Sequence, residues 1–338
     1  MARISHALST GEPRLSEAIG VFLLLVAGLL ALDLGVFHRK AHTVGMMEAL
    51  GWTVFWIVCA MLFNVGVWAA YEHRWFGLAP APDSPLHPKD AMDAALLFLT
   101  GYGFEKALSL DNIFVIAVLL RWFRIPARHQ HRLLFWGIIG AIIMRGVFIY
   151  AGAALIEQFA WTFVIMGAFL VISGVRLWFE NDEEHDPEQS FLYRKLLRHL
   201  PVAEGDHGPR FLVRVNGRLM ATRMLVALLM IEASDVIFAV DSIPVIFGIT
   251  MDPFIILTSN IFAILGLRSL FFVLEQGLAK FDYLKKSVTV ILVFIGFKMV
   301  LHDWIQIGTG VSLTVLAVAL ASGIVMSLLR KPKAAPPA

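Results

Sequence analysis

Long apolar runs recur along the whole chain, and they constrain its fold more than any other feature. The hydrocarbon core of a bilayer is about 30 Å thick, and a helix crosses it in roughly 20 apolar residues. Backbone inside lipid must satisfy its own hydrogen bonds, so only helices and closed barrels span it. Because 58% of the 338 residues are hydrophobic and 16% are charged, the runs predict a polytopic membrane protein of helices rather than a soluble domain.

The predicted fold class is all-α, with about nine transmembrane helices. Lys and Arg concentrate in alternate connections, among them 121–132, 180–221 and 276–286, and in the C-terminal tail. By the positive-inside rule these connections are cytoplasmic, which places the N-terminus outside and the C-terminus inside the cytoplasmic (inner) membrane of a bacterium. The expected spans are 15–37, 50–71, 91–120, 132–154, 158–179, 222–250, 254–275, 285–303 and 308–329.

One acidic pattern occurs twice inside the apolar runs. Residues 105–116 read EKALSLDNIFVI and residues 235–246 read DVIFAVDSIPVI, so each copy has a carboxylate six residues before an Asp that a small polar residue follows. Ionisable groups at lipid depth are costly and mark function by default. The candidate site therefore consists of Glu105, Asp111, Asn112, Glu232, Asp235, Asp241 and Ser242.

The repetition extends beyond these motifs to units of three spans. Arg145 and Arg176 are 31 residues apart in the first unit, and Arg268 and Lys298 are 30 apart in the second. Since three is an odd number, the second unit enters the membrane from the opposite side, an architecture typical of transporters with a midplane site. The predicted organisation is 1–90 with two spans and an outer loop, repeat 91–179, cytoplasmic loop 180–221, inverted repeat 222–303, and 304–338 with the last span and a basic tail.

Oxygen is the ligand atom that both motifs offer, since neither contains His or Cys. Carboxylate and amide oxygens suit hard cations such as Mg²⁺, Ca²⁺ and Mn²⁺. The alternative is that the acids are structural and are neutralised by Arg145, Arg268, Lys106, Arg176 or Lys298. Arg176 and Lys298 lie near span ends, where long basic side chains extend toward water. The five acids exceed the other three cations, which favours a cation site.

The six-residue spacing raises a geometric question. Residues six apart on a straight helix point about 120° away from each other, so one ion cannot contact both. Gly101 and Gly103 precede the first motif, and Pro244 follows Asp241. We therefore expect discontinuous helices at the motifs.

Enzymatic and redox functions find little support in the sequence. The single cysteine, Cys59, excludes a disulfide within the chain. No nucleophile–base set or cofactor-binding loop accompanies the motifs, so we expect neither an enzyme nor a prosthetic group. The net charge of +2 gives no indication of nucleic-acid binding.

The two motifs resemble the signatures of the TerC family of integral membrane proteins, and Leu32 to Arg39 also resembles its Alx-like branch. That resemblance implies a fold similar to the lysine-exporter superfamily, with Mn(II) exported from the cytoplasm as the transported substrate. It carries the metal-binding role onto Glu105, Asp111, Glu232, Asp235 and Asp241. The alternative function is a membrane scaffold or stress-response partner in tellurium resistance. The sequence leaves open whether the metal is Mn, Ca, Mg or Fe, whether transport is coupled to protons, and whether the protein forms a homo-oligomer. The expected partner of its apolar surface is the lipid bilayer.

Overall fold

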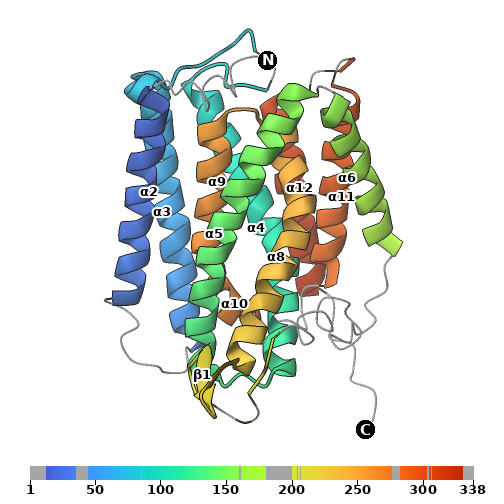
Figure 1. Ribbon diagram of the computed structural model, residues 1–338. Helices are drawn as coiled ribbons and strands as arrows, with labels where there is room; N and C mark the ends of the chain where they lie inside the picture. Colours follow the sequence, from blue (N-terminus) through green and yellow to red (C-terminus); the bar gives the residue numbers. More distant parts are fainter. Residues whose placement is uncertain are drawn as a thin grey trace.

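Helices running between two ends of a bundle make up most of the molecule (Figure 1). The computed structural model describes residues 13–35, 45–84, 86–159, 161–179, 200–203, 205, 207–275, 282–302, 304–305 and 307–329. Its helices are α2 (Pro13–Gly35), α3 (Met46–Glu72), η1 (Trp75–Gly77), α4 (Ala91–Trp122), α5 (Ala127–Gln158), α6 (Trp161–Phe179), α8 (Arg223–Ile249), α9 (Pro253–Leu265), α10 (Leu267–Glu275), α11 (Asp282–Val300) and α12 (Thr309–Leu329).

The prediction of a mainly helical membrane protein is confirmed. Within the described residues, five helices are long and apolar enough to cross a bilayer, namely α2, α3, α5, α6 and α12. The bent pair α9 and α10 makes a sixth when it is counted as one span. Large apolar side chains such as Leu24 (75% exposed) and Leu62 (67% exposed) cover the outside of the bundle, where lipid replaces water.

The expected helix breaks at the two motifs are not found. Both α4 and α8 continue as unbroken helices through them, even with Pro244 inside α8. A Cβ atom on Gly101 would approach both Ile246 Cδ1 and Ser259 Oγ to 2.7 Å. Gly101 therefore lets α4 lie close to α8 and α9, and this packing role replaces the predicted role as a breaker.

A break occurs instead at Gly266, between α9 and α10. The two helices differ in direction by 42°, and Gly266 itself has non-helical torsion angles (φ −87°, ψ 5°). A Cβ at this position would lie 2.9 Å from Lys106 Nζ and 3.0 Å from Trp56 Cβ. Close approach of α3 and α4 to the bend thus requires glycine here.

Helices α6 and α11 pack along each other through small residues. A Cβ on Gly296 would come within 2.7 Å of the Gly167 carbonyl oxygen, and a Cβ on Gly174 within 2.7 Å of Val293. Close backbone approach at small residues is a usual way for helices to associate in lipid, where the hydrophobic effect gives no drive.

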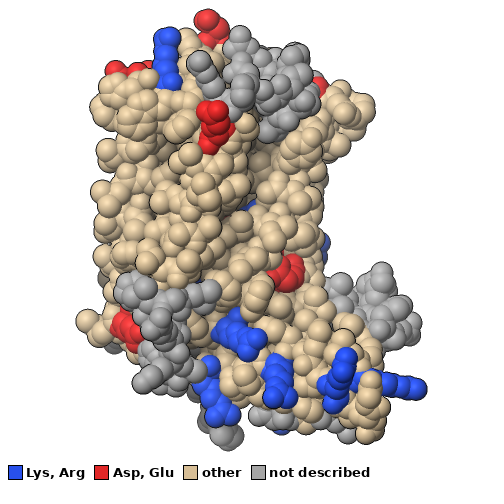
Figure 2. Space-filling view, turned by 60° about the vertical axis from the view of Figure 1, so that its left-hand side comes forward, with Lys and Arg blue, Asp and Glu red and all other residues tan. Residues whose placement is uncertain are grey.

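One end of the bundle, which we call the basic end, is formed by the α4–α5 connection, the start of α8 and a hairpin that the sequence did not predict. Strand β1 (Leu212–Val215) pairs antiparallel with β2 (Arg218–Ala221), and Asn216 and Gly217 turn between them with positive φ angles. Figure 2 shows Lys and Arg gathered at this end, at the bottom of the view. Exposed basic residues here are Arg121, Arg124, Arg128, Arg132, Arg210, Arg214, Arg218 and Arg223.

At the opposite end, the α8–α9 connection holds the loop that follows α3. The Leu86 carbonyl accepts hydrogen bonds from the Thr250 hydroxyl (2.9 Å) and the Met251 N–H (2.8 Å). Tyr71 of α3 donates its hydroxyl to Asp252 at 2.7 Å, and the other Asp252 oxygen caps α9. Burial raises the pKa of the Asp252 carboxyl.

Candidate functional site

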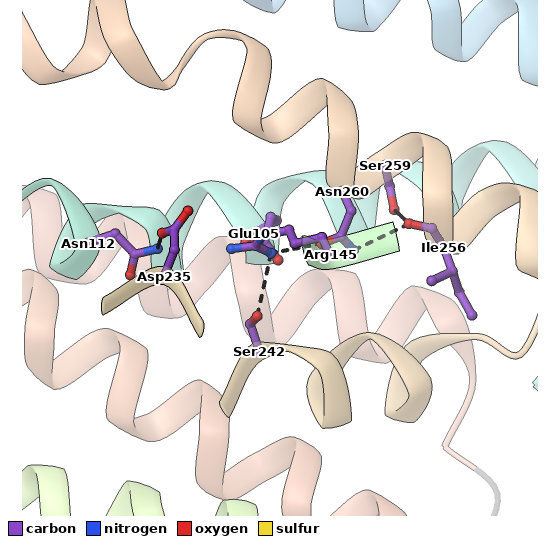
Figure 3. A network of polar contacts seen from close by, with 8 residues as sticks. All are labelled: Glu105, Asn112, Arg145, Asp235, Ser242, Ile256, Ser259 and Asn260. Atoms are coloured by element: carbon purple, nitrogen blue, oxygen red, sulfur yellow. Dashed lines mark hydrogen bonds and ion pairs between the residues drawn. The ribbon is translucent and has the colours of Figure 1, made fainter. Parts of the chain in front are cut away.

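Arg145 lies at the centre of the bundle and joins four helices. Its guanidinium on α5 forms an ion pair with Glu105 of α4, and both side chains are 4% exposed. Nη1 also donates to Asn260 Oδ1 of α9 at 2.8 Å and to Ser242 Oγ of α8 at 3.4 Å (Figure 3). The cost of burying this guanidinium is offset because the Glu105 carboxylate and two hydrogen-bond acceptors surround it.

A second contact between the motifs involves Asn112 and Asp235. Asn112 Nδ2 on α4 donates to Asp235 Oδ1 on α8 at 3.2 Å (Figure 3). Asp235 lies within electrostatic range of Arg145, which attracts it, and of Glu105, which repels it. Parts of both motifs therefore meet where α4 packs against α8.

The three acids of α8 are only partly buried, in contrast to Glu105. Glu232 lies one turn before Asp235 and faces α5, and it makes no hydrogen bond or ion pair with any residue that the structure describes. Asp241 turns toward α6, where Ser173 Oγ donates to its Oδ1 at 3.4 Å. Because α8 is unbroken, Asp235 and Asp241 face different neighbours.

The other predicted residues lie around this centre. Arg268 on α10 places Nη1 3.4 Å from His131 Nε2. Lys106 places its ammonium 5.7 Å from the centre of the Tyr102 ring, a cation–π contact beside the α9–α10 bend. The side chain of Asp111 lies outside the described part of the chain.

A small cavity adjoins Asp235 on the side of Arg268. Gly137 of α5 and Phe271 of α10 form part of its wall, and its volume is about 20 Å³. That volume holds a water. Among the side chains that the structure describes, no three His, Cys, Asp or Glu come together as a metal-binding group.

Residues 91–335, which begin with the first residue of α4, match the TerC family of integral membrane proteins. The chain belongs to the TerC family. All candidate-site residues of this TerC protein lie in the matched part, whereas α2 and α3 precede it.

Relatives of this TerC protein cover almost its whole length. An uncharacterized membrane protein of Myxococcus xanthus is 46% identical over 323 residues, 95% of this chain and 94% of its own. An uncharacterized membrane protein of Rickettsia felis is 40% identical over 92% of this chain and 97% of its own. A Salmonella typhi protein, named as a candidate membrane-bound redox modulator, Alx, is 42% identical over 88% of this chain and 89% of its own. No solved structure gives a significant match.

Sequence reasoning missed two polar residues at the site, one beside Arg145 and one beside Asp241. Asn260 interrupts the apolar run of α9, and Ser173 interrupts that of α6. A polar side chain in an apolar span is a usable signal, since lipid depth penalises it unless it has a partner. Its partner, however, lies on another helix and cannot be read from the run.

Proposed function

We propose that the protein is a secondary transporter that exports a divalent metal cation, Mn(II) foremost, from the cytoplasm. The observation that carries this proposal is the meeting of two acidic motifs between α4 and α8. Asn112 of the first motif contacts Asp235 of the second, and Arg145 connects Glu105 of the first to Ser242 of the second.

The charges at this centre favour a cation over an anion. Arg145 neutralises Glu105, whereas Asp235 accepts a hydrogen bond from the neutral amide of Asn112. An ionised Asp235 beside the Glu105–Arg145 pair leaves a net charge of −1, and Glu232 one turn away is a further carboxylate. A cation bound beside Asp235 would relieve this repulsion.

The ligand chemistry favours a hard cation such as Mn²⁺. The Asp235 carboxylate and the Asn112 amide oxygen are oxygen ligands, and Asp111 next to Asn112 is a further candidate. Six-coordinate oxygen sites suit Mn²⁺, with waters completing the shell. The manganese ion in this proposal is the transported substrate.

The packing of the helices supports the inverted repeat and alternating access. Helix α4 of the first unit packs against α9 of the second, and α8 of the second packs against α5 of the first. These two contacts are equivalent if α4 corresponds to α8 and α5 to α9, as the repeat predicts. In this proposal the chain has nine spans, with the bent α9–α10 as the seventh, and the basic end faces the cytoplasm of a bacterial inner membrane, as the positive-inside rule predicts.

The second candidate function is a membrane scaffold or stress-response partner whose acids are structural. The Glu105–Arg145 pair fits that role, since each charge neutralises the other. Asp235 and Glu232 do not fit it, because neither has a cationic ion-pair partner among the described residues. A redox role is disfavoured by the lone Cys59 on α3.

Manganese uptake into inverted membrane vesicles separates the two functions. Vesicles with the wild-type chain should accumulate Mn²⁺, and a comparison with and without a pH gradient reports proton coupling. Vesicles with an equal amount of inserted Asp235→Asn should lose at least nine-tenths of the uptake. Wild-type uptake no greater than that of empty vesicles would leave the scaffold as the function.

A further inference from the structure

Gly140 of α5 lies directly against the Glu232 carboxylate of α8. A Cβ atom built on Gly140 would overlap Glu232 Cδ and both carboxylate oxygens. The end of the Glu232 side chain therefore occupies the space that any other residue at 140 would fill.

Other glycines of α5 show that this contact is specific. A Cβ on Gly137, one turn earlier, would lie 4.0 Å from Glu232 Oε1 and 3.7 Å from Ile231 Cγ2, which are ordinary contacts. A Cβ on Gly146 would meet nothing within 4 Å. The chain thus contains matched glycines in one helix, with and without the carboxylate as neighbour.

The position of the Glu232 carboxylate has an electrostatic consequence. Glu232 and Asp235 lie one turn apart on the same face of α8, so the negative charge of Asp235 repels that of Glu232. Asp235 also lines the cavity to which Gly137 contributes. A long flexible acid in a lipid-depth helix would otherwise extend toward water and away from this repulsion.

We propose that Gly140 is a positioning residue. Because glycine has no side chain, the Glu232 carboxylate can lie between α5 and α8, within reach of a cation held at Asp235. This inference rests on the proposed function, because it takes the cation at Asp235 as given. It means that a residue of α5, outside both acidic motifs, helps to determine the metal affinity of the transporter.

Manganese affinity of the purified full-length protein tests this role, with MnCl₂ alone as the titrant in calorimetry. Gly140→Ala should raise the dissociation constant at least fivefold, because the Cβ displaces the carboxylate. Gly146→Ala should stay within twofold of wild type, and Gly137→Ala should fall between them.

A double-mutant cycle separates positioning from helix packing. Glu232→Asp shortens the side chain by one methylene and withdraws it from residue 140. In the Glu232→Asp background, Gly140→Ala should change the Mn²⁺ affinity less than twofold. The same small change is expected in the Glu232→Gln background, because that variant has already lost the charge of the carboxylate. An equal loss from Gly140→Ala in all backgrounds would show a packing role and overturn the proposal.

The remaining outcomes are also decisive. If Gly140→Ala does not insert but its combination with Glu232→Asp does, the steric contact with Glu232 is supported. Failure of both to insert overturns the proposal in favour of packing. Wild-type protein that binds no Mn²⁺ removes the proposed function, and this inference with it. Wild-type binding with unchanged affinity in Gly140→Ala overturns this inference alone.

Discussion

Glu105 and Asp235 occupy corresponding positions of the two acidic motifs, yet their surroundings differ. Glu105 is 3% exposed and forms an ion pair with Arg145, which Asn260 holds from another helix. Asp235 is half-buried and receives one hydrogen bond from the neutral amide of Asn112. The two motifs thus hold one acid whose charge an arginine compensates and one whose hydrogen-bond donor is neutral.

This difference assigns different work to the two halves. A buried ion pair is held by mutual attraction, and removal of one partner leaves a charge that lipid-depth surroundings cannot solvate. An acid with a neutral partner can exchange that contact for a metal ion or a proton at smaller cost. We therefore expect Glu105 of α4 to govern stability and Asp235 of α8 to govern binding.

The largest effect should come from breaking the compensated side. Arg145→Met leaves Glu105 buried without its cation, which should lower the unfolding free energy by about 3–5 kcal/mol. Thermal unfolding in detergent measures the loss. Addition of Glu105→Gln to this variant should restore part of it, since no charge is then left unpaired. A loss below about 1 kcal/mol for Arg145→Met would remove the distinction between the halves.

Neutralising the uncompensated side should affect binding instead. Asp235→Asn removes the charge that a cation would contact, and we expect the Mn²⁺ dissociation constant to rise about thirtyfold, or ~2 kcal/mol. Its melting temperature should be unchanged or higher. Asp83→Asn, in the exposed loop between α3 and α4, serves as the control for loss of one acid. Reduced stability with intact affinity would make Asp235 structural.

Asp252 is a buried acid outside the motifs. It accepts hydrogen bonds from the Tyr71 hydroxyl and from two backbone N–H groups of α9. Tyr71→Phe removes its hydroxyl donor and should cost about 1.5 kcal/mol of stability, with the Mn²⁺ affinity unchanged. Tyr150→Phe, at an exposed tyrosine, is the matched control. A change in affinity in Tyr71→Phe would connect α3 to the site.

The smallest effect is expected at Asp241, which faces α6 rather than α4. Asp241→Asn should weaken Mn²⁺ binding less than threefold, or ~0.6 kcal/mol. Ser173→Ala, which removes its hydrogen-bond donor, should resemble it. If Asp241→Asn equals Asp235→Asn in the same titration, both acids contact one ion, and α8 would have to break in the bound state.

The sequence by itself determined where helices form and which residues carry charge into them. Apolar runs and basic connections are local properties, so the helices lie in the expected ranges and the basic residues gather at one end. The acidic motifs were visible for the same reason, since a carboxylate in an apolar run stands out without any knowledge of its neighbours.

Only the tertiary structure decided which acid has a partner. Arg145 reaches Asn260 over 115 residues of sequence, and Asn112 reaches Asp235 over 123. The glycines before the first motif suggested a break, but Gly101 allows close packing against α8 and α9, and Gly103 lies against Leu316 of α12 instead. Pairing, close approach and the contact of Gly140 with Glu232 all depend on which helix faces are brought together. Hydropathy and spacing along one helix carry no information about that choice.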